Sequence, residues 1–287
     1  MNDAAIHFTE LLNQIANTVC RFLLAPLGLL PEVPGALIVA VLTGILMLIA
    51  FKYTSSQNAI KNVRNGIKAE LLALSLFKDS VAVSLGSQRR IITGAIKLML
   101  LSLLPISVMA IPVTLLLGQL SLWWEARPVR IGEDVVVTLS LSGTARSEWP
   151  KVELASTPGL DVTSGPFRIR SRREVCWELQ GRTAGGHHLV FDVDGRKIEK
   201  DIAVGDNPMR VSIRRPEWNW FEVLLHPAES PFIADDPVKS IAVQYSGDTV
   251  WTTGRYSSFV FHSWIVFWFF VSTIAAFCFR GVLRVSF

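Results

Sequence analysis

The chain has 287 residues, of which 50% are hydrophobic and only 18% are charged. A soluble domain carries about 25% charged residues, so this composition argues against both a disordered chain and an ordinary soluble globule. The formal net charge of +4 is small, and the distribution of the charges along the chain is therefore more informative than their sum.

The segment before the first long apolar stretch, residues 1–32, has the pattern of an amphipathic helix. Its apolar residues recur at steps of three and four positions: Phe8, Leu11, Leu12, Ile15, Val19, Phe22 and Leu23. Asn13, Asn17 and other polar residues fall on the opposite side, and Pro26 ends the pattern. We expect a helix that lies on the outer membrane surface; a helix packed on an exoplasmic domain is the alternative.

Three stretches contain no Asp, Glu, Lys or Arg. They are residues 33–51, 98–124 and 256–279, with lengths of 19, 27 and 24 residues. A bilayer core of about 30 Å needs about 20 helical residues to cross it. We therefore expect three transmembrane helices, at residues 33–53, 93–124 and 259–280.

A helical hairpin is expected between the first two spans, over residues 54–92. Its first arm carries apolar residues near heptad spacing: Ile60, Val63, Ile67, Leu71 and Leu74. Residues 80–90 fit a returning second helix, and the pair would form a short coiled coil.

The charges indicate the orientation of the chain. Residues 52–97 hold eight basic and two acidic side chains, whereas residues 125–258 hold 17 basic and 19 acidic ones. Basic residues in short loops stay in the cytoplasm, so the hairpin and the tail at residues 281–287 should be cytoplasmic. The N-terminus and residues 125–258 then lie in the periplasm, if the membrane is a bacterial inner membrane.

Residues 125–258 form a polar block whose pattern is typical of β-strands. Val135, Val137, Leu139 and Leu141 alternate with more polar residues. Similar runs at residues 167–170, 174–179, 188–193, 198–204, 209–213 and 240–245 are separated by turn signals at 157–159, 164–166, 184–186, 194–195 and 205–208. About seven short strands at this spacing predict an immunoglobulin-like β-sandwich. Residues 214–240, with four prolines, should be irregular. The fold class is thus an α+β membrane protein.

The sequence lacks the signatures of catalytic chemistry. Phosphate loops, G-x-S-x-G and H-E-x-x-H are missing. His187 and His188 are adjacent on an expected strand and point to opposite faces, so they are poor ligands for one metal ion. We expect no catalytic residue, no metal, no cofactor and no nucleic-acid partner, and hence no enzyme.

The polar and aromatic residues of the spans are the candidate functional residues. Those that we expect to line a polar groove are Lys52, Ser107, Thr114, Ser272 and Thr273. We expect Pro105 and Pro112 to kink the second span, and Trp123, Trp124, Trp264 and Trp268 to form an interface belt. The alternative is that the hydroxyls bond their own helix backbone and that Lys52 extends its amine to the membrane surface.

The order of these parts resembles the YidC-type membrane-insertase superfamily, in particular its three-span members of archaea and of the endoplasmic reticulum. Residues 49–54, Ile-Ala-Phe-Lys-Tyr-Thr, are similar to the end of the first span there, and Arg127-Pro128-Val129 to a basic-proline region after the second. Phe-Lys-Tyr-Thr-Ser at 51–55 and Leu-Phe-Lys-Asp at 76–79 resemble an uncharacterised bacterial membrane-protein group.

The resemblance implies a hydrophilic groove, open to the cytoplasm and to lipid, that lowers the barrier for a polar segment of a client protein. Lys52 matches the position of the basic groove residue. The first expected function is therefore insertion or assembly of membrane proteins, with nascent membrane proteins as partners. The second is a non-catalytic, membrane-anchored assembly subunit whose periplasmic β domain binds an envelope protein.

Overall fold

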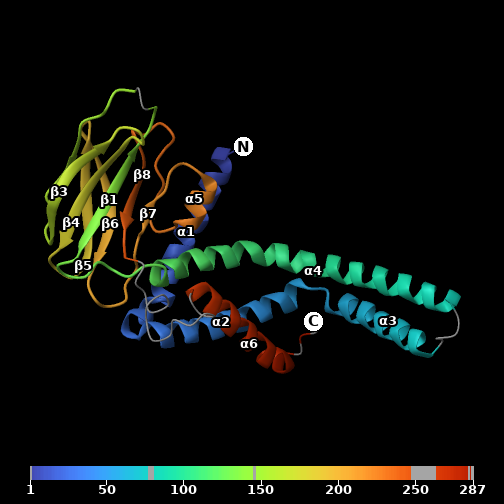
Figure 1. The fold of residues 1–287 in the computed structure, drawn as a ribbon. Coiled ribbons are helices and arrows are strands. Elements are labelled where there is room, and N and C mark those ends of the chain that lie inside the picture. The colour runs from blue at the N-terminus through green and yellow to red at the C-terminus, as the bar shows by residue number, and fades with distance from the viewer. Residues whose placement is uncertain (1, 77–80, 145–146, 247–262, 284, 286–287) are drawn as a thin grey trace. The chain divides into compact units, whose positions relative to one another are not determined.

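A computed structural model describes all residues except 1, 77–80, 145–146, 247–262, 284 and 286–287 (Figure 1). Helices and antiparallel sheets are both present. The chain divides into two compact units. The first, here the β unit, comprises residues 1–35 and 114–266; the second, the helical unit, comprises residues 36–113 and 267–287. Each unit is described by itself.

The β unit contains two antiparallel sheets (Figure 1). The larger sheet has the strand order β3 (Leu160–Ile169), β4 (Glu174–Gly181), β1 (Asp134–Leu141), β8 (Val238–Gln244) and β7 (Arg214–Arg215). The smaller sheet has the order β2 (Val152–Leu154), β5 (Gly185–Val193) and β6 (Arg196–Val204).

The two sheets share one hydrophobic core. In β1 the predicted alternation is confirmed, because Val135, Val137, Leu139 and Leu141 are all buried. Trp177 of β4 packs on Phe191 of the smaller sheet, with ring centroids 5.2 Å apart. Side chains of both sheets thus exclude water from a common interior.

Several expected turns are confirmed. β5 and β6 form a hairpin whose two-residue turn is Asp194-Gly195. Both residues have positive φ, 49° and 83°, which matches the twist of the flanking strands. The signals at residues 157–159 and 205–208 also separate strands, whereas of the signal at 184–186 only residue 184 precedes β5, which begins at Gly185.

Two expectations for this block are wrong, and one strand was missed. Residues 164–166 lie inside β3, where the strand continues through two register shifts, because the irregularity is accommodated at a sheet edge. Residues 209–213 form no strand, since the Val211 N–H donates to the Leu122 carbonyl of α4 (2.7 Å), although the Ile213 carbonyl accepts from the Val243 N–H of β8 (2.9 Å). The short strand β2 was not expected.

The N-terminal helix α1 (Asn2–Leu23) covers the predicted stripe and is followed by a 3₁₀ turn, η1 (Ala25–Leu29). Asp3 in its first turn and Arg21 in its last complement the helix dipole. A six-residue helix, α5 (Trp220–Leu225), lies within the stretch expected to be irregular. The side chain of Asn219 starts it by accepting a hydrogen bond from the Phe221 N–H.

Three helices are long and apolar enough to cross a membrane: α2 (Glu32–Thr54), residues 84–124 of α4 (Val81–Trp124), and α6 (Trp264–Leu283). The first two include the expected spans. The start of the expected third span, residues 259–262, lies outside the described residues, and α6 runs three residues past the expected end at 280.

The hairpin is present, but its second arm is not a separate helix. α3 (Gln57–Leu76) forms the first arm, and the second arm is the beginning of α4, which continues without interruption into the span. No helix-breaking residue other than Gly94 lies between residues 91 and 97, which explains the continuity. Arg90 pairs with Glu70 across the two arms at 3.1 Å, and the Ile67 side chain of α3 lies against Gly94 of α4.

Within the helical unit, α2 and α6 approach closely at Gly44. A Cβ atom at Gly44 would clash with the backbone carbonyl of Ser272. Small residues permit such close packing between apolar helices.

Replacing Gly44 by alanine should therefore destabilise the protein by about 1–3 kcal/mol, the usual effect of overpacking. Gly66→Ala on α3 is the matched control, because nothing lies within 4 Å of the added methyl group; it should stabilise, since alanine favours helix over glycine. Thermal unfolding of the full chain in detergent measures both. Equal shifts for the two variants would contradict the close packing.

Candidate functional site

The five expected groove residues differ in burial and in the unit to which they belong. Lys52 is half-buried in the last turn of α2. Ser272 of α6 is 5% exposed, and Thr273 is half-buried. Ser107 is exposed on α4. Thr114 is half-buried and belongs to the β unit, so the structure does not place it relative to the other four.

A cavity of about 370 Å³ is lined by all three apolar helices of the helical unit. The lining residues are Gly44, Met47, Val113, Trp268, Phe269, Ser272, Thr273, Ala276 and Phe277. Of the expected groove residues, Ser272 and Thr273 belong to this lining, whereas Lys52 and Ser107 do not. The cavity is thus mainly apolar, with two hydroxyl groups on one helix.

Several hydroxyls of the spans bond their own backbone. Thr43 donates to the carbonyl of Val39 (2.7 Å), and Ser272 to that of Phe269 (3.1 Å). Ser102 does the same on α4, with Leu98 as acceptor. These three hydroxyls thus form the hydrogen bond to their own helix backbone that is the alternative to lining a groove.

The structure also shows the burial of the prolines and tryptophans of the spans. α4 continues through Pro105, which is buried, and Pro112, which is exposed. Trp124 and Trp264 pack on each other with centroids 6.0 Å apart and are almost fully buried.

The other two belt residues are also at least partly covered by protein. Trp123 is half-buried next to Gly28. Trp268 is buried, and its indole N–H has no hydrogen-bond partner among the described residues. Three of the four belt residues therefore contact protein over most of their surface, and their depth in a membrane stays a prediction.

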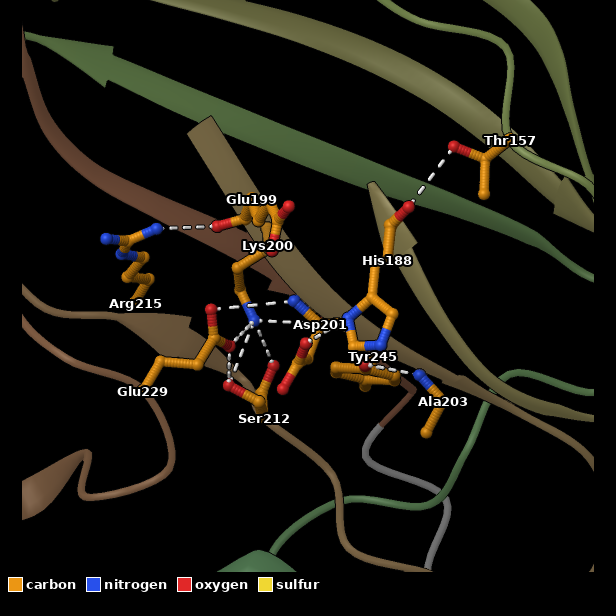
Figure 2. A network of polar contacts seen from close by, with 10 residues as sticks. All are labelled: Thr157, His188, Glu199, Lys200, Asp201, Ala203, Ser212, Arg215, Glu229 and Tyr245. Atoms are coloured by element: carbon orange, nitrogen blue, oxygen red, sulfur yellow. Dashed lines mark hydrogen bonds and ion pairs between the residues drawn. The ribbon is translucent and has the colours of Figure 1, made fainter. Parts of the chain in front are cut away.

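A second polar site, which the sequence analysis missed, surrounds Lys200 of β6 (Figure 2). The Lys200 side chain is fully buried. Its amine donates to Glu229 Oε1 (2.6 Å), to the Ser212 carbonyl (2.7 Å) and to the Asp201 carbonyl (2.9 Å). The Ser212 hydroxyl also contacts both charged groups.

This ion pair connects β6 to two irregular segments. Burial is the main influence on Lys200 and lowers its pKa, and the charge of Glu229 opposes this. A buried charge is tolerated only when it is paired and hydrogen-bonded. The pair therefore fixes the backbone around Ser212 and Glu229 against the smaller sheet.

One sequence signal could have identified Lys200. In the expected strand, Ile198, Lys200, Ile202 and Val204 share one face by period-two alternation, so the lysine occupies an inward position. No such signal exists for Glu229, because its segment has no regular period.

Neighbouring groups extend the network. His188 Nδ1 lies 2.7 Å from Asp201 Oδ1, and Figure 2 shows the two side chains on adjacent strands, pointing toward each other. The Tyr245 hydroxyl accepts a hydrogen bond from the Ala203 N–H (3.1 Å), and burial raises the pKa of Tyr245. Among the described residues, no group of three or more His, Cys, Asp or Glu side chains fits a metal ion.

The polar face of α1 docks inside the β unit. Asn13 donates to the Val223 carbonyl (2.6 Å) and Asn17 to the Pro227 carbonyl (2.7 Å). Asn17 Oδ1 accepts from Gln119 of α4 (2.9 Å) and from Arg210 (2.8 Å). These contacts join α1, α5 and the end of α4.

The apolar face of α1 is left uncovered by protein. Phe8, Leu11, Ile15, Val19, Phe22 and Leu23 are between 49% and 78% exposed. The polar side of α1 thus packs on the β unit, as in the alternative, and contact of its apolar side with the membrane surface stays a prediction.

Comparison with family models, with curated proteins and with solved structures finds no match to this chain.

Replacing Glu229 by glutamine should lower the free energy of unfolding by about 3–5 kcal/mol, because the charge of Lys200 would stay buried without a counter-charge. Denaturant unfolding of the full chain in detergent measures the loss. Glu153→Gln is the control, since its pair with Lys151 is 64–74% exposed and should contribute little. Similar losses for both variants would show that the buried pair has no special role.

Proposed function

We propose that this chain is a multi-pass protein of a bacterial inner membrane that assists insertion or assembly of other membrane proteins. The client would be a nascent membrane protein with a polar segment that must cross the bilayer. Such a segment meets a barrier of about 2.5–3.5 kcal/mol per charged residue at the membrane centre. No cofactor and no covalent step is required.

The observation that carries the proposal is the cavity lined by α2, α4 and α6. It brings the hydroxyl residues Ser272 and Thr273 to a place where three apolar helices meet. Polar groups and a void at that depth offer a client segment an environment between water and lipid. Lys52, at the end of α2, would supply the positive charge at the cytoplasmic mouth.

The remaining features support the same orientation. The net +6 of residues 52–97 favours a cytoplasmic hairpin. The exposed apolar stripe of α1 supports a helix on the outer membrane surface. Two antiparallel sheets with one core support an immunoglobulin-like sandwich in the periplasm.

A second function is favoured by a specific observation. Thr43, Ser102 and Ser272 bond their own helices, and Ser107 is exposed away from the cavity lining. Scattered hydroxyls fit spans that only anchor the protein while its β domain binds an envelope partner.

The orientation predicts opposite labelling of two engineered cysteines. With Cys20, Cys176 and Cys278 replaced by serine, Arg168→Cys on β3 should react with a membrane-impermeant maleimide on intact spheroplasts. Lys61→Cys on α3 should react only after lysis. Both positions are exposed in the structure, so the membrane alone decides the result. The reverse pattern would overturn the orientation.

The groove predicts that Lys52→Leu and Thr273→Phe each reduce insertion of a dependent client in proteoliposomes, by about tenfold. The first variant removes the charge at the mouth, and the second fills the cavity. Protein abundance and thermal stability should stay near those of the wild type.

Two controls match these changes. Lys61→Leu removes the same charge from an exposed site of α3, and Ile274→Phe adds the same ring to a residue of α6 that is 61% exposed. Both should insert the client at the wild-type rate. If Lys52→Leu and Thr273→Phe also do so, the groove is wrong and the anchor function holds.

A further inference from the structure

A second cavity, of about 420 Å³, lies wholly within the β unit. Its wall includes Arg21 from the last turn of α1, Arg210 from the segment after β6, and His187 and His188 from β5. Asp201 of β6 also lines it. Figure 2 shows part of this wall, with His188 directed at Asp201.

The cavity has an excess of positive charge. The acidic Asp201 is engaged by His188 at 2.7 Å. Within the described part of the chain, no carboxylate forms an ion pair with Arg21 or Arg210. Two guanidinium groups therefore face one cavity whose lining holds one carboxylate, Asp201, which acts on Arg210 without forming an ion pair with it.

Arg210 is held in a fixed position by neutral groups. It donates to Asn17 Oδ1 (2.8 Å) and approaches Gln119 Oε1 (3.4 Å). Both arginines line the same cavity; burial, and then the charge of Arg21, lower the pKa of Arg210, and the charges of Cys20 and Asp201 oppose this. An anion between the two guanidinium groups would offset the effect of the Arg21 charge and would accept hydrogen bonds from both planar donors.

We infer that this cavity binds the phosphate headgroup of an anionic phospholipid. The helix that carries Arg21 offers apolar surface for the rest of such a lipid, because Val19, Phe22 and Leu23 are near Arg21 in the sequence and are 49%, 78% and 70% exposed. Acyl chains would cover these side chains while the headgroup meets the arginines. The choice of lipid over free phosphate rests on the proposed membrane location of the chain.

Native mass spectrometry of the full chain in detergent tests the site. Phosphatidylglycerol, phosphatidylcholine and inorganic phosphate are the three probes. We expect saturable retention of phosphatidylglycerol, weaker retention of phosphatidylcholine and none of inorganic phosphate. Arg21→Gln should weaken phosphatidylglycerol binding by about tenfold, since one charge-assisted contact is lost.

Two further variants keep the result interpretable. Arg168→Gln removes an exposed arginine from β3 and should bind like the wild type. Arg21→Gln/Arg210→Gln should abolish binding, and a melting curve without lipid shows whether the junction around Asn17 is intact. Arg21 is exposed, so Arg21→Gln should leave the fold intact. If the double variant unfolds, the lipid binding of Arg21→Gln alone tests the site.

Equal phosphatidylglycerol binding by the wild type, Arg21→Gln and Arg168→Gln would overturn the site. Binding of inorganic phosphate as tight as that of the lipid would overturn the lipid assignment. Neither readout depends on client insertion, so failure of the lipid site and failure of the insertion proposal are distinguishable.

Discussion

Buried polar groups need hydrogen-bond partners, and this requirement determines how α1 packs in the β unit. The carbonyls of Val223 and Pro227 lie at and just beyond the end of a six-residue helix, which is too short to satisfy its own terminal groups. Two side-chain amides of α1, from Asn13 and Asn17, supply the missing donors. Unpaired carbonyls at a buried site would cost about 1–3 kcal/mol each. The docked face of α1 must therefore be its polar face, and its apolar face is left outward.

Because α1 docks through its polar face, its side chains also hold the neighbouring segments in place. Because Asn17 also accepts from Gln119 and Arg210, the same amide links the helix to the end of α4 and to the segment after β6. That segment is fixed from its other side by Lys200 and Glu229. Two polar clusters thus hold a stretch of chain that has no regular hydrogen bonding of its own.

Much of the fold could be predicted from periodicity alone. The alternation at Val135 to Leu141 identifies β1 and its buried face, and uncharged stretches identify the three apolar helices. Local patterns cannot show which face of α1 packs on protein, because the carbonyls that select it are more than 200 residues distant. They also cannot show that Ser107 and Ser272 differ in burial, since both are hydroxyls in apolar helices.

The continuity of α4 has a mechanical consequence. Its 44 residues extend about 66 Å at 1.5 Å per residue, roughly twice the thickness of a bilayer core. The return arm of the hairpin and the span are one continuous helix, without a loop between them. Pro105 and Pro112 each omit one backbone hydrogen bond, so bending of this helix costs least at these two positions.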